Sequence, residues 1–171
     1  MKLKLKYNII YVLLLIFACN NSDQTSIYPR HVGDIAFDEA IDEKGFQLCN
    51  GEKEVRQYFN FSKGLQYEGE KLAIIETFKS EYKPIQSEKE TGLIRIRFIV
   101  NCKGQSGRFR TICMNNDYQK KDFDNRIINQ LLTITKKLSG WRIMPDNSKP
   151  HDYYQYLIFK MESGQIKEIL P

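Results

Sequence analysis

The sequence predicts an α+β domain in which an antiparallel sheet packs on two helices. Several segments alternate apolar and polar residues, which is typical of half-buried strands. Two others carry apolar residues three or four positions apart, which is typical of amphipathic helices. The strand-like segments come in neighbouring pairs joined by short glycine-containing turns, and such turns connect antiparallel strands. A sheet and helices of this kind bury their apolar surfaces against each other.

Four segments are expected to form the sheet. Residues 93–102 alternate clearly, and residues 108–114 return after a turn that contains two glycines. Residues 153–161 and 165–170 form a second pair. A further hairpin is predicted with residues 46–49 and 55–61 on either side of Asn50-Gly51, because this dipeptide favours two-residue hairpin turns. The predicted inward face of the first strand consists of Ile94, Ile96, Phe98, Val100 and Cys102.

Two segments are expected to form the helices. The first, residues 69–82, ends before Pro84, because a proline disfavours helix at the residue that precedes it. The second, residues 118–139, has Asn116 or Asp117 as its expected N-cap. Their predicted apolar faces are Leu72, Ile74, Ile75, Phe78 and Tyr82 in the first helix, and Phe123, Ile127, Ile128, Leu131, Ile134 and Leu138 in the second.

The charge balance argues against a nucleic-acid-binding protein. The chain has 26 Lys and Arg and 21 Asp and Glu, a formal net charge of +5. Lys2, Lys4 and Lys6 supply three of these charges, which leaves +2 for the rest of the chain. Binding a polyanion requires a strongly basic surface. The hydrophobic fraction of 42% and the charged fraction of 27% are those of an ordinary globular protein.

The N-terminus has the pattern of an export signal. Its apolar run, residues 9–18, is about half of the ~20 residues that a membrane-spanning helix needs. It therefore predicts a signal peptide over residues 1–18. Leu15-Ile16-Phe17-Ala18-Cys19 resembles a bacterial lipobox, and this resemblance implies acyl chains on Cys19 that anchor the protein to a membrane. The alternative is an ordinary secretory signal in which Cys19 carries no lipid.

The lipobox also implies a location. Residues 19–34 are polar and have no apolar period, so we expect a lipidated tether followed by a single domain over residues 35–171. In lipoproteins an aspartate directly after the cysteine retains the protein at the inner membrane, and here that residue is Asn20. The resemblance thus implies a bacterial cell-envelope protein anchored in the outer membrane and facing the periplasm.

Three segments, taken together, resemble the C-terminal domain of TonB, the bacterial energy transducer. They are the glycine, alternating strand and turn of residues 92–104, the aromatic-basic-x-x-Pro sequence of residues 141–145, and the strand of residues 156–161. Tyr82-Lys83-Pro84 is a looser match. The resemblance covers residues 82–171 and implies the same α+β fold. The hairpin region around Asn50-Gly51 lies outside it.

The TonB resemblance implies a mode of binding. The family's domain takes up a short peptide of an outer-membrane transporter as an added strand, with main-chain hydrogen bonds for affinity and side-chain pockets for selectivity. Carried over, the receiving edge is the strand of residues 153–161. The alternative is that this strand is covered, because open edges promote aggregation. The residues implied on one face of the edge are Tyr154, Tyr156, Ile158 and Lys160.

The chain also departs from TonB in ways that limit the expected function. A lipobox stands in place of the inner-membrane helix, and the five prolines are scattered and form no rod. We therefore expect binding without energy transduction.

Three cysteines remain for the domain. An exported protein can form disulfides, and an odd number leaves at least one thiol free. Cys102 lies near the turn that joins the two strands, and Cys113 lies far from it. The expected distance between their Cα atoms therefore exceeds the limit of about 7 Å that a disulfide allows. The favoured pair is Cys49 with Cys102, while Cys49 with Cys113 and three free thiols stay open. No C-x-x-C spacing occurs, so no metal site is expected.

Four arginines form a predicted basic patch. Arg95 and Arg97 alternate on the solvent side of one strand, and Arg108 and Arg110 alternate on the next. They share a face if the turn keeps the register, whereas a slip by one residue sends the second pair inward. Such a patch suits acidic partners or lipid head groups. The alternative is an ordinary solvated sheet face balanced by nearby Glu and Asp.

The sequence favours a non-catalytic protein. The chain has two histidines and contains no G-x-S-x-G, H-E-x-x-H or phosphate-binding loop, so we expect no catalytic residues and no cofactor. The expected function is a protein-binding module of the cell envelope that is associated with transport across the outer membrane. One alternative is a structural or assembly lipoprotein that homodimerises through its sheet edges. An enzyme that uses the spare thiol is the least favoured alternative.

Overall fold

The computed structural model describes residues 34–57, 65–145 and 149–170. The chain divides into two units, Met1–Asp34 and Ile35–Pro171, and every element below belongs to the second. The predicted signal peptide, Cys19 and residues 20–33 of the predicted tether lie outside the described residues. Within the described ranges, no helix has the length and apolar character needed to cross a membrane.

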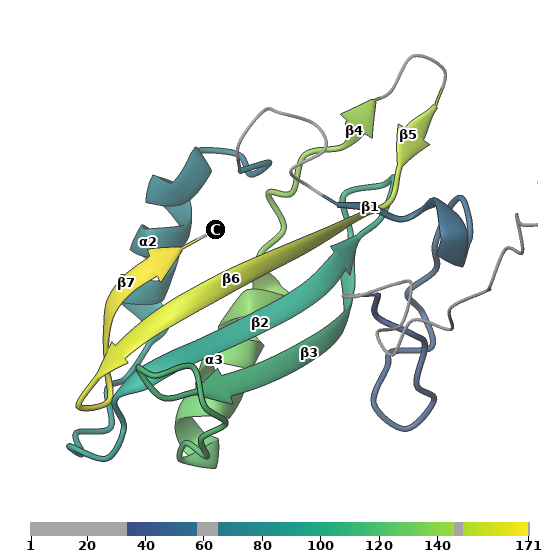
Figure 1. Cartoon of the computed structure of the whole chain (residues 1–171). Coiled ribbons are helices and arrows are strands. Elements are labelled where there is room, and N and C mark those ends of the chain that lie inside the picture. Colours follow the sequence, from purple (N-terminus) through teal and green to yellow (C-terminus); the bar gives the residue numbers. More distant parts are fainter. Residues whose placement is uncertain (1–33, 58–64, 146–148, 171) are drawn as a thin grey trace, which may run out of the picture. The chain divides into compact units, whose positions relative to one another are not determined.

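Five strands form one sheet with the order β1-β6-β2-β3, and β7 also pairs with β6 (Figure 1). They are β1 Arg56–Gln57, β2 Gly92–Val100, β3 Ser106–Met114, β6 Tyr153–Glu162 and β7 Gln165–Leu170. A separate pair consists of β4 Met144–Pro145 and β5 Pro150–His151. The α+β class is confirmed. The predicted antiparallel sheet is corrected to a mixed one, because β1 pairs with β6 in parallel.

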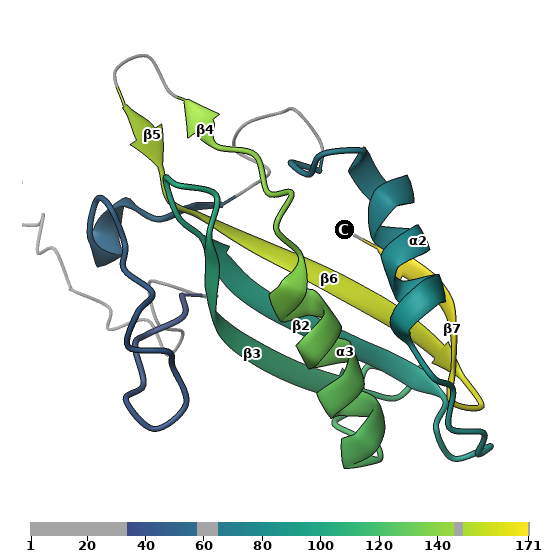
Figure 2. The same cartoon turned by 180° about the vertical axis from the view of Figure 1, so that it is seen from behind.

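Two helices cover one face of the sheet, α2 Glu70–Glu81 and α3 Asn125–Lys137 (Figure 2). Both are shorter than predicted. α3 begins after Asp124, whose carboxylate accepts a hydrogen bond from the Arg126 N–H, and not after Asn116 or Asp117. Leu72 is 63% exposed and does not belong to the buried face of α2. Residues of both helices and both central strands share one core, which includes Ile74, Phe78, Ile94, Ile96, Phe98, Ile127, Leu131, Leu157 and Phe159.

The other face of the sheet is partly covered by residues 35–55. Ile35, Ile99 and Tyr154 form a second, smaller core on this face, and Phe46, Leu48 and Val55 pack against it. This segment replaces the hairpin predicted around Asn50-Gly51. Gly51, with a φ of 87°, leads into the short 3-10 helix Glu52–Glu54, after which β1 joins β6. Residues 58–61 of the predicted hairpin lie outside the described residues.

Candidate functional site

The strand expected to receive a partner, β6, is not a sheet edge. It pairs with β2 from Tyr153 to Met161, and on its other side it pairs with β1 at its start and with β7 from Ile158 to Glu162. The prediction that β6 is the receiving edge is therefore wrong, because the hairpin that follows it places β7 along this side. Tyr154, Tyr156, Ile158 and Lys160 do lie on one face of β6, opposite the residues buried against the helices.

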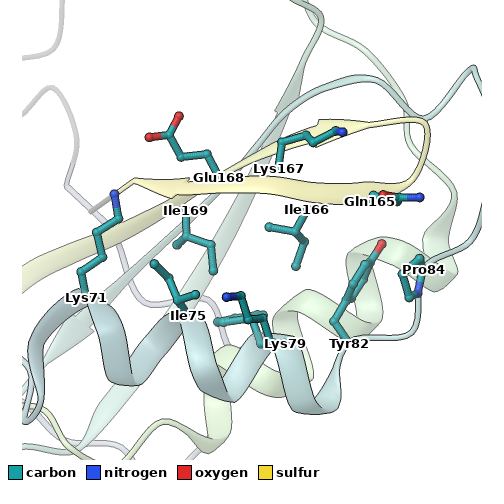
Figure 3. A pocket seen from close by; sticks show the side chains of 11 residues that line it. Lys71, Ile75, Lys79, Tyr82, Pro84, Gln165, Ile166, Lys167, Glu168 and Ile169 are labelled. Carbon is teal, nitrogen blue, oxygen red and sulfur yellow. The ribbon is translucent and has the colours of Figure 1, made fainter.

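Among the described residues, β7 pairs only with β6 and so forms an edge of the sheet. Its ladder contains a bulge, because Glu168 lies opposite Lys160 whereas Ile166 lies opposite Met161. Lys167 is the extra residue. A bulge changes the alternation of side chains. Ile166 and Ile169, three positions apart, consequently both point toward α2 (Figure 3).

A groove of about 470 Å³ lies between α2 and β7 (Figure 3). Its apolar lining combines Ile75 and Phe78 of α2 with Ile166 and Ile169 of β7. Tyr82 stands at one end of the groove, and its hydroxyl donates a hydrogen bond of 2.8 Å to the Gly164 carbonyl oxygen. Burial, together with the negative charge of Glu90, raises the pKa of Tyr82 to about 12, so this hydroxyl remains a donor at neutral pH.

The rim of the groove is basic on its helical side. Lys71 and Lys79 of α2 line the groove, and neither has an ion-pair partner among the described residues. Lys167 of β7 pairs with Glu162 at 2.7 Å, and Glu168 is its neighbour on the same strand. Lys167 is thus paired within the chain, whereas Lys71 and Lys79 have no ion-pair partner among the described residues.

Helical spacing explains why α2 presents this surface. Lys71, Ile75 and Lys79 follow each other at intervals of four residues and therefore share one stripe of the helix. Gly69, with a φ of 74°, precedes the helix, and a Cβ at this position would lie 2.8 Å from the Ala73 Cβ. The first turn of α2 therefore depends on a glycine at its N-cap.

Two arginines of the predicted basic patch are neutralised by acidic residues of the segment 35–55. The Arg108 guanidinium donates two hydrogen bonds of 2.7 Å to Glu52, and it is only 7% exposed. Arg110 donates to both carboxylate oxygens of Asp42, and these bonds lower the pKa of Asp42.

A bulge in β3 brings Arg108 to this position, because Arg97 pairs with Arg110 whereas Ile99 pairs with Gly107. Arg95 stacks over the ring of Tyr156, with its guanidinium carbon 4.5 Å from the ring centroid. Arg108 and Arg110 thus hold the segment 35–55 against the sheet, so their guanidinium groups are already occupied within the chain.

Cys49 and Cys102 form a disulfide, the pairing that the sequence favours, with a Cα separation of 6.0 Å. Asp152 lies beside it, and no motif in the sequence points to this residue. Its carboxylate accepts backbone N–H hydrogen bonds from Cys49, Asn50 and Cys102 at 2.9, 2.9 and 3.0 Å. The two sulfur atoms are bonded to each other, and the carboxylate already accepts three hydrogen bonds. The role of this cluster is therefore structural, because it holds residues 49 and 50 next to Cys102 and Asp152.

Cys113 is the free cysteine of the described residues and is expected to react slowly in the folded protein. Burial, with the charges of Asp122 and Glu90, raises its pKa from 9.0 to about 11. Since only the thiolate reacts, alkylation at pH 8 should be roughly 100-fold slower than after unfolding.

A Cys19→Ser variant removes the thiol of Cys19, so that only the cysteines of the domain are counted. After denaturation without reductant, this variant should titrate as one thiol per chain. Three thiols per chain would contradict the disulfide between Cys49 and Cys102.

Comparisons with known proteins do not assign a role to the groove. No family model matches the chain, and neither a curated protein nor a solved structure matches it. Its role is therefore inferred from its geometry, which combines an edge strand, an apolar lining and two lysines without ion-pair partners among the described residues. These properties suit an elongated ligand with apolar and acidic groups.

Proposed function

We propose that the chain is a non-catalytic binding module of the bacterial cell envelope, which takes up an extended segment of another envelope protein between α2 and β7. The observation that carries this proposal is the edge strand β7 beside a groove with an apolar lining. Strand addition uses this combination, because the edge supplies main-chain hydrogen bonds and the neighbouring pockets select side chains. The receiving strand is β7, which takes the role first expected of β6.

The arrangement of elements supports a TonB C-terminal-like fold for the module. β2 with its turn, the exit from α3 and β6 contain, in chain order, the three segments that resemble TonB. Trp141, from the second of these segments, is buried and contacts the rings of Tyr67 and Phe98. A link to transport across the outer membrane follows from this resemblance.

The lipobox-like sequence at Cys19 supports a lipid anchor in the outer membrane, with the domain facing the periplasm. The polar residues between Cys19 and the domain reach at most roughly 50 Å when extended. The groove then stays near the membrane surface. Its partner is accordingly a membrane protein, such as a transporter, or a periplasmic protein that works close to the membrane.

The features of the sheet edges favour uptake of a separate peptide over homodimerisation. A bulge and charged side chains hinder pairing at any edge, and they hinder two copies of β7 most, because both folded strands then carry the bulge at Lys167, whereas a free peptide can adapt its backbone to it. One end of β3 is also covered, because the Lys121 N–H donates to the Cys113 carbonyl oxygen. A separate peptide, unlike a second β7 fixed in its own sheet, can also fill the groove.

Crosslinking in intact cells tests the proposal. A photoreactive amino acid in place of Lys167 should form an adduct with one envelope protein, and the attachment site should fall within a single segment of that protein. The control places the same amino acid at Lys103, an exposed position in the turn between β2 and β3, where this adduct should not form. An adduct between two copies of this chain would favour the homodimer, and identical adducts from both positions would contradict a site at β7.

A further inference from the structure

We infer that the groove between α2 and β7 selects an extended segment in which two acidic residues stand four positions apart, with an apolar residue midway between them. This inference rests on the proposed function and names the chemistry of its partner. The positions of Lys71, Ile75 and Lys79 along α2 carry it.

The spacing of the two lysines matches that of an extended chain. Lys71 and Lys79 are eight residues apart in a helix, so their Cα atoms are separated by about 12 Å along its axis. An extended chain rises about 3.3 Å per residue and points residues i, i+2 and i+4 to the same side. Acidic residues at i and i+4 are therefore about 13 Å apart and can reach both lysines at once.

The centre of the groove calls for an apolar side chain. Ile75 lies midway between the two lysines on the same stripe of α2, and Ile166 and Ile169 face it from β7 (Figure 3). Residue i+2 of the ligand points to the same side as its acidic residues and so meets this apolar surface. A polar residue there would lose water without gaining a hydrogen-bond partner from these side chains.

The charge distribution explains why the ligand is acidic. On the β7 side Lys167 pairs with Glu162, and Glu168 lines the groove as one carboxylate, whereas the two lysines on the α2 side, Lys71 and Lys79, have no ion-pair partner among the described residues. A ligand carboxylate at each lysine removes this imbalance. The apolar lining between them partly excludes water, which strengthens such pairs over those on an open surface.

The two-lysine geometry also favours a peptide over a lipid. A fatty acid or a lipid with one anionic head group presents a single negative site. It can satisfy Lys71 or Lys79 but not both across about 12 Å. A peptide with two carboxylates occupies the whole length of the groove.

Synthetic peptides provide the direct test. The probe, termed the diacidic peptide, is a capped nine-residue peptide with glutamate at its third and seventh positions, valine at its fifth and serine elsewhere, titrated into the purified chain. We expect it to bind at least tenfold more tightly than the peptide with glutamine at both acidic positions. It should show the same advantage over a peptide with glutamate at its third and sixth positions, which lie on opposite sides of a strand. Equal affinity of all three peptides, or binding of none, would overturn the inference.

Charge reversal in the protein provides the matched test. The double variant Lys71→Glu/Lys79→Glu should lose at least tenfold in affinity for the diacidic peptide and should prefer a peptide with lysine at both acidic positions. The control Lys89→Glu/Lys103→Glu changes the net charge equally at exposed positions outside the groove and should bind like the wild type. Thermal unfolding verifies that both variants are folded. An equal loss in both variants would mean that only net charge matters, which contradicts the inference.

The crosslink at Lys167 separates the inference from the function on which it rests. The photoreactive amino acid at position 167 is also placed in the double variant Lys71→Glu/Lys79→Glu. If the partner still crosslinks to this protein as it does to the wild type, the inference of an acidic ligand is wrong and the proposed binding function stands. If the wild type gives no partner adduct at all, the proposed function itself fails. Binding of the wild type, but not of the double variant, to phosphatidylglycerol vesicles without binding to the peptide would replace the peptide by a lipid and overturn the inference.

Discussion

Replacing Asp152 with asparagine is expected to lower the free energy of unfolding by about 3 kcal/mol. Asp152 is 0% exposed, and its two carboxylate oxygens accept hydrogen bonds from the backbone N–H groups of Cys49, Asn50 and Cys102. Asparagine has the same size but only one acceptor oxygen, and its amide group carries two donors of its own. At least one of the three N–H groups then faces another donor and loses its partner.

Urea denaturation measures this effect. The midpoint for Asp152→Asn should fall while the dependence on urea stays the same, since the folded structure is kept and only its stability changes. Asp117→Asn is the control, because Asp117 is exposed in a turn and should shift the free energy of unfolding by less than about 0.5 kcal/mol. Equal shifts in the two variants would mean that the three hydrogen bonds do not stabilise the fold.

The parts of the fold that the sequence predicts well depend on neighbouring residues. The alternation of β2 and the helical faces of α2 and α3 follow from local spacing, and their apolar residues are buried with few exceptions such as Leu72. The position of Cys102 and Cys113 on two strands joined by a short turn argues against a bond between them, and it leaves Cys49 as the partner of one or the other. In both cases the geometry over a few residues restricts the choice.

The parts that the sequence does not predict depend on contacts between distant segments. Asn50-Gly51 is a good hairpin signal, yet Asp152, about a hundred residues later, fixes its backbone through the Cys49 and Asn50 N–H groups. The short strand β1 then pairs with β6 instead of completing a hairpin. Residues 165–170 are predictable as a strand, but the side of β6 on which they lie is not encoded in their alternation. For this reason the edge implied by the TonB resemblance falls on β6, whereas the structure has β7 on that side of it.

The candidate site illustrates the same limit. Lys71, Ile75 and Lys79 are part of a predicted helix, but the facing surface comes from β7, at the far end of the chain. The bulge at Lys167 turns Ile166 and Ile169 to the same side, and a strict alternation of residues does not predict this. The bulge near Arg108 likewise changes the environment of the basic patch. Such bulges are set by tertiary packing. The sequence alone therefore predicts neither the groove between α2 and β7 nor the environment of the basic patch.

Removing the disulfide with Cys49→Ser/Cys102→Ser is expected to lower the free energy of unfolding by about 4 kcal/mol. The two cysteines are 53 residues apart, and the bond limits the conformations of this loop in the unfolded chain. Reductant should destabilise the wild type by a similar amount and leave the variant unchanged. Cys113→Ser is the control, because this thiol is half-buried and takes no part in the bond. A loss below about 1 kcal/mol would contradict a stabilising disulfide.

The disulfide and Asp152 should not act independently. Both hold residues 49 and 50 against the turn after β2, so the loss of the bond gives this segment a way to detach from Asp152. Once it detaches, the hydrogen bonds of Asp152 are already broken, and Asp152→Asn has less to remove. The triple variant should therefore lose less than the roughly 7 kcal/mol expected from adding the two effects. Full additivity would show that the Asp152 hydrogen bonds persist without the disulfide, and that the backbone of residues 49–50 is held in place by other contacts.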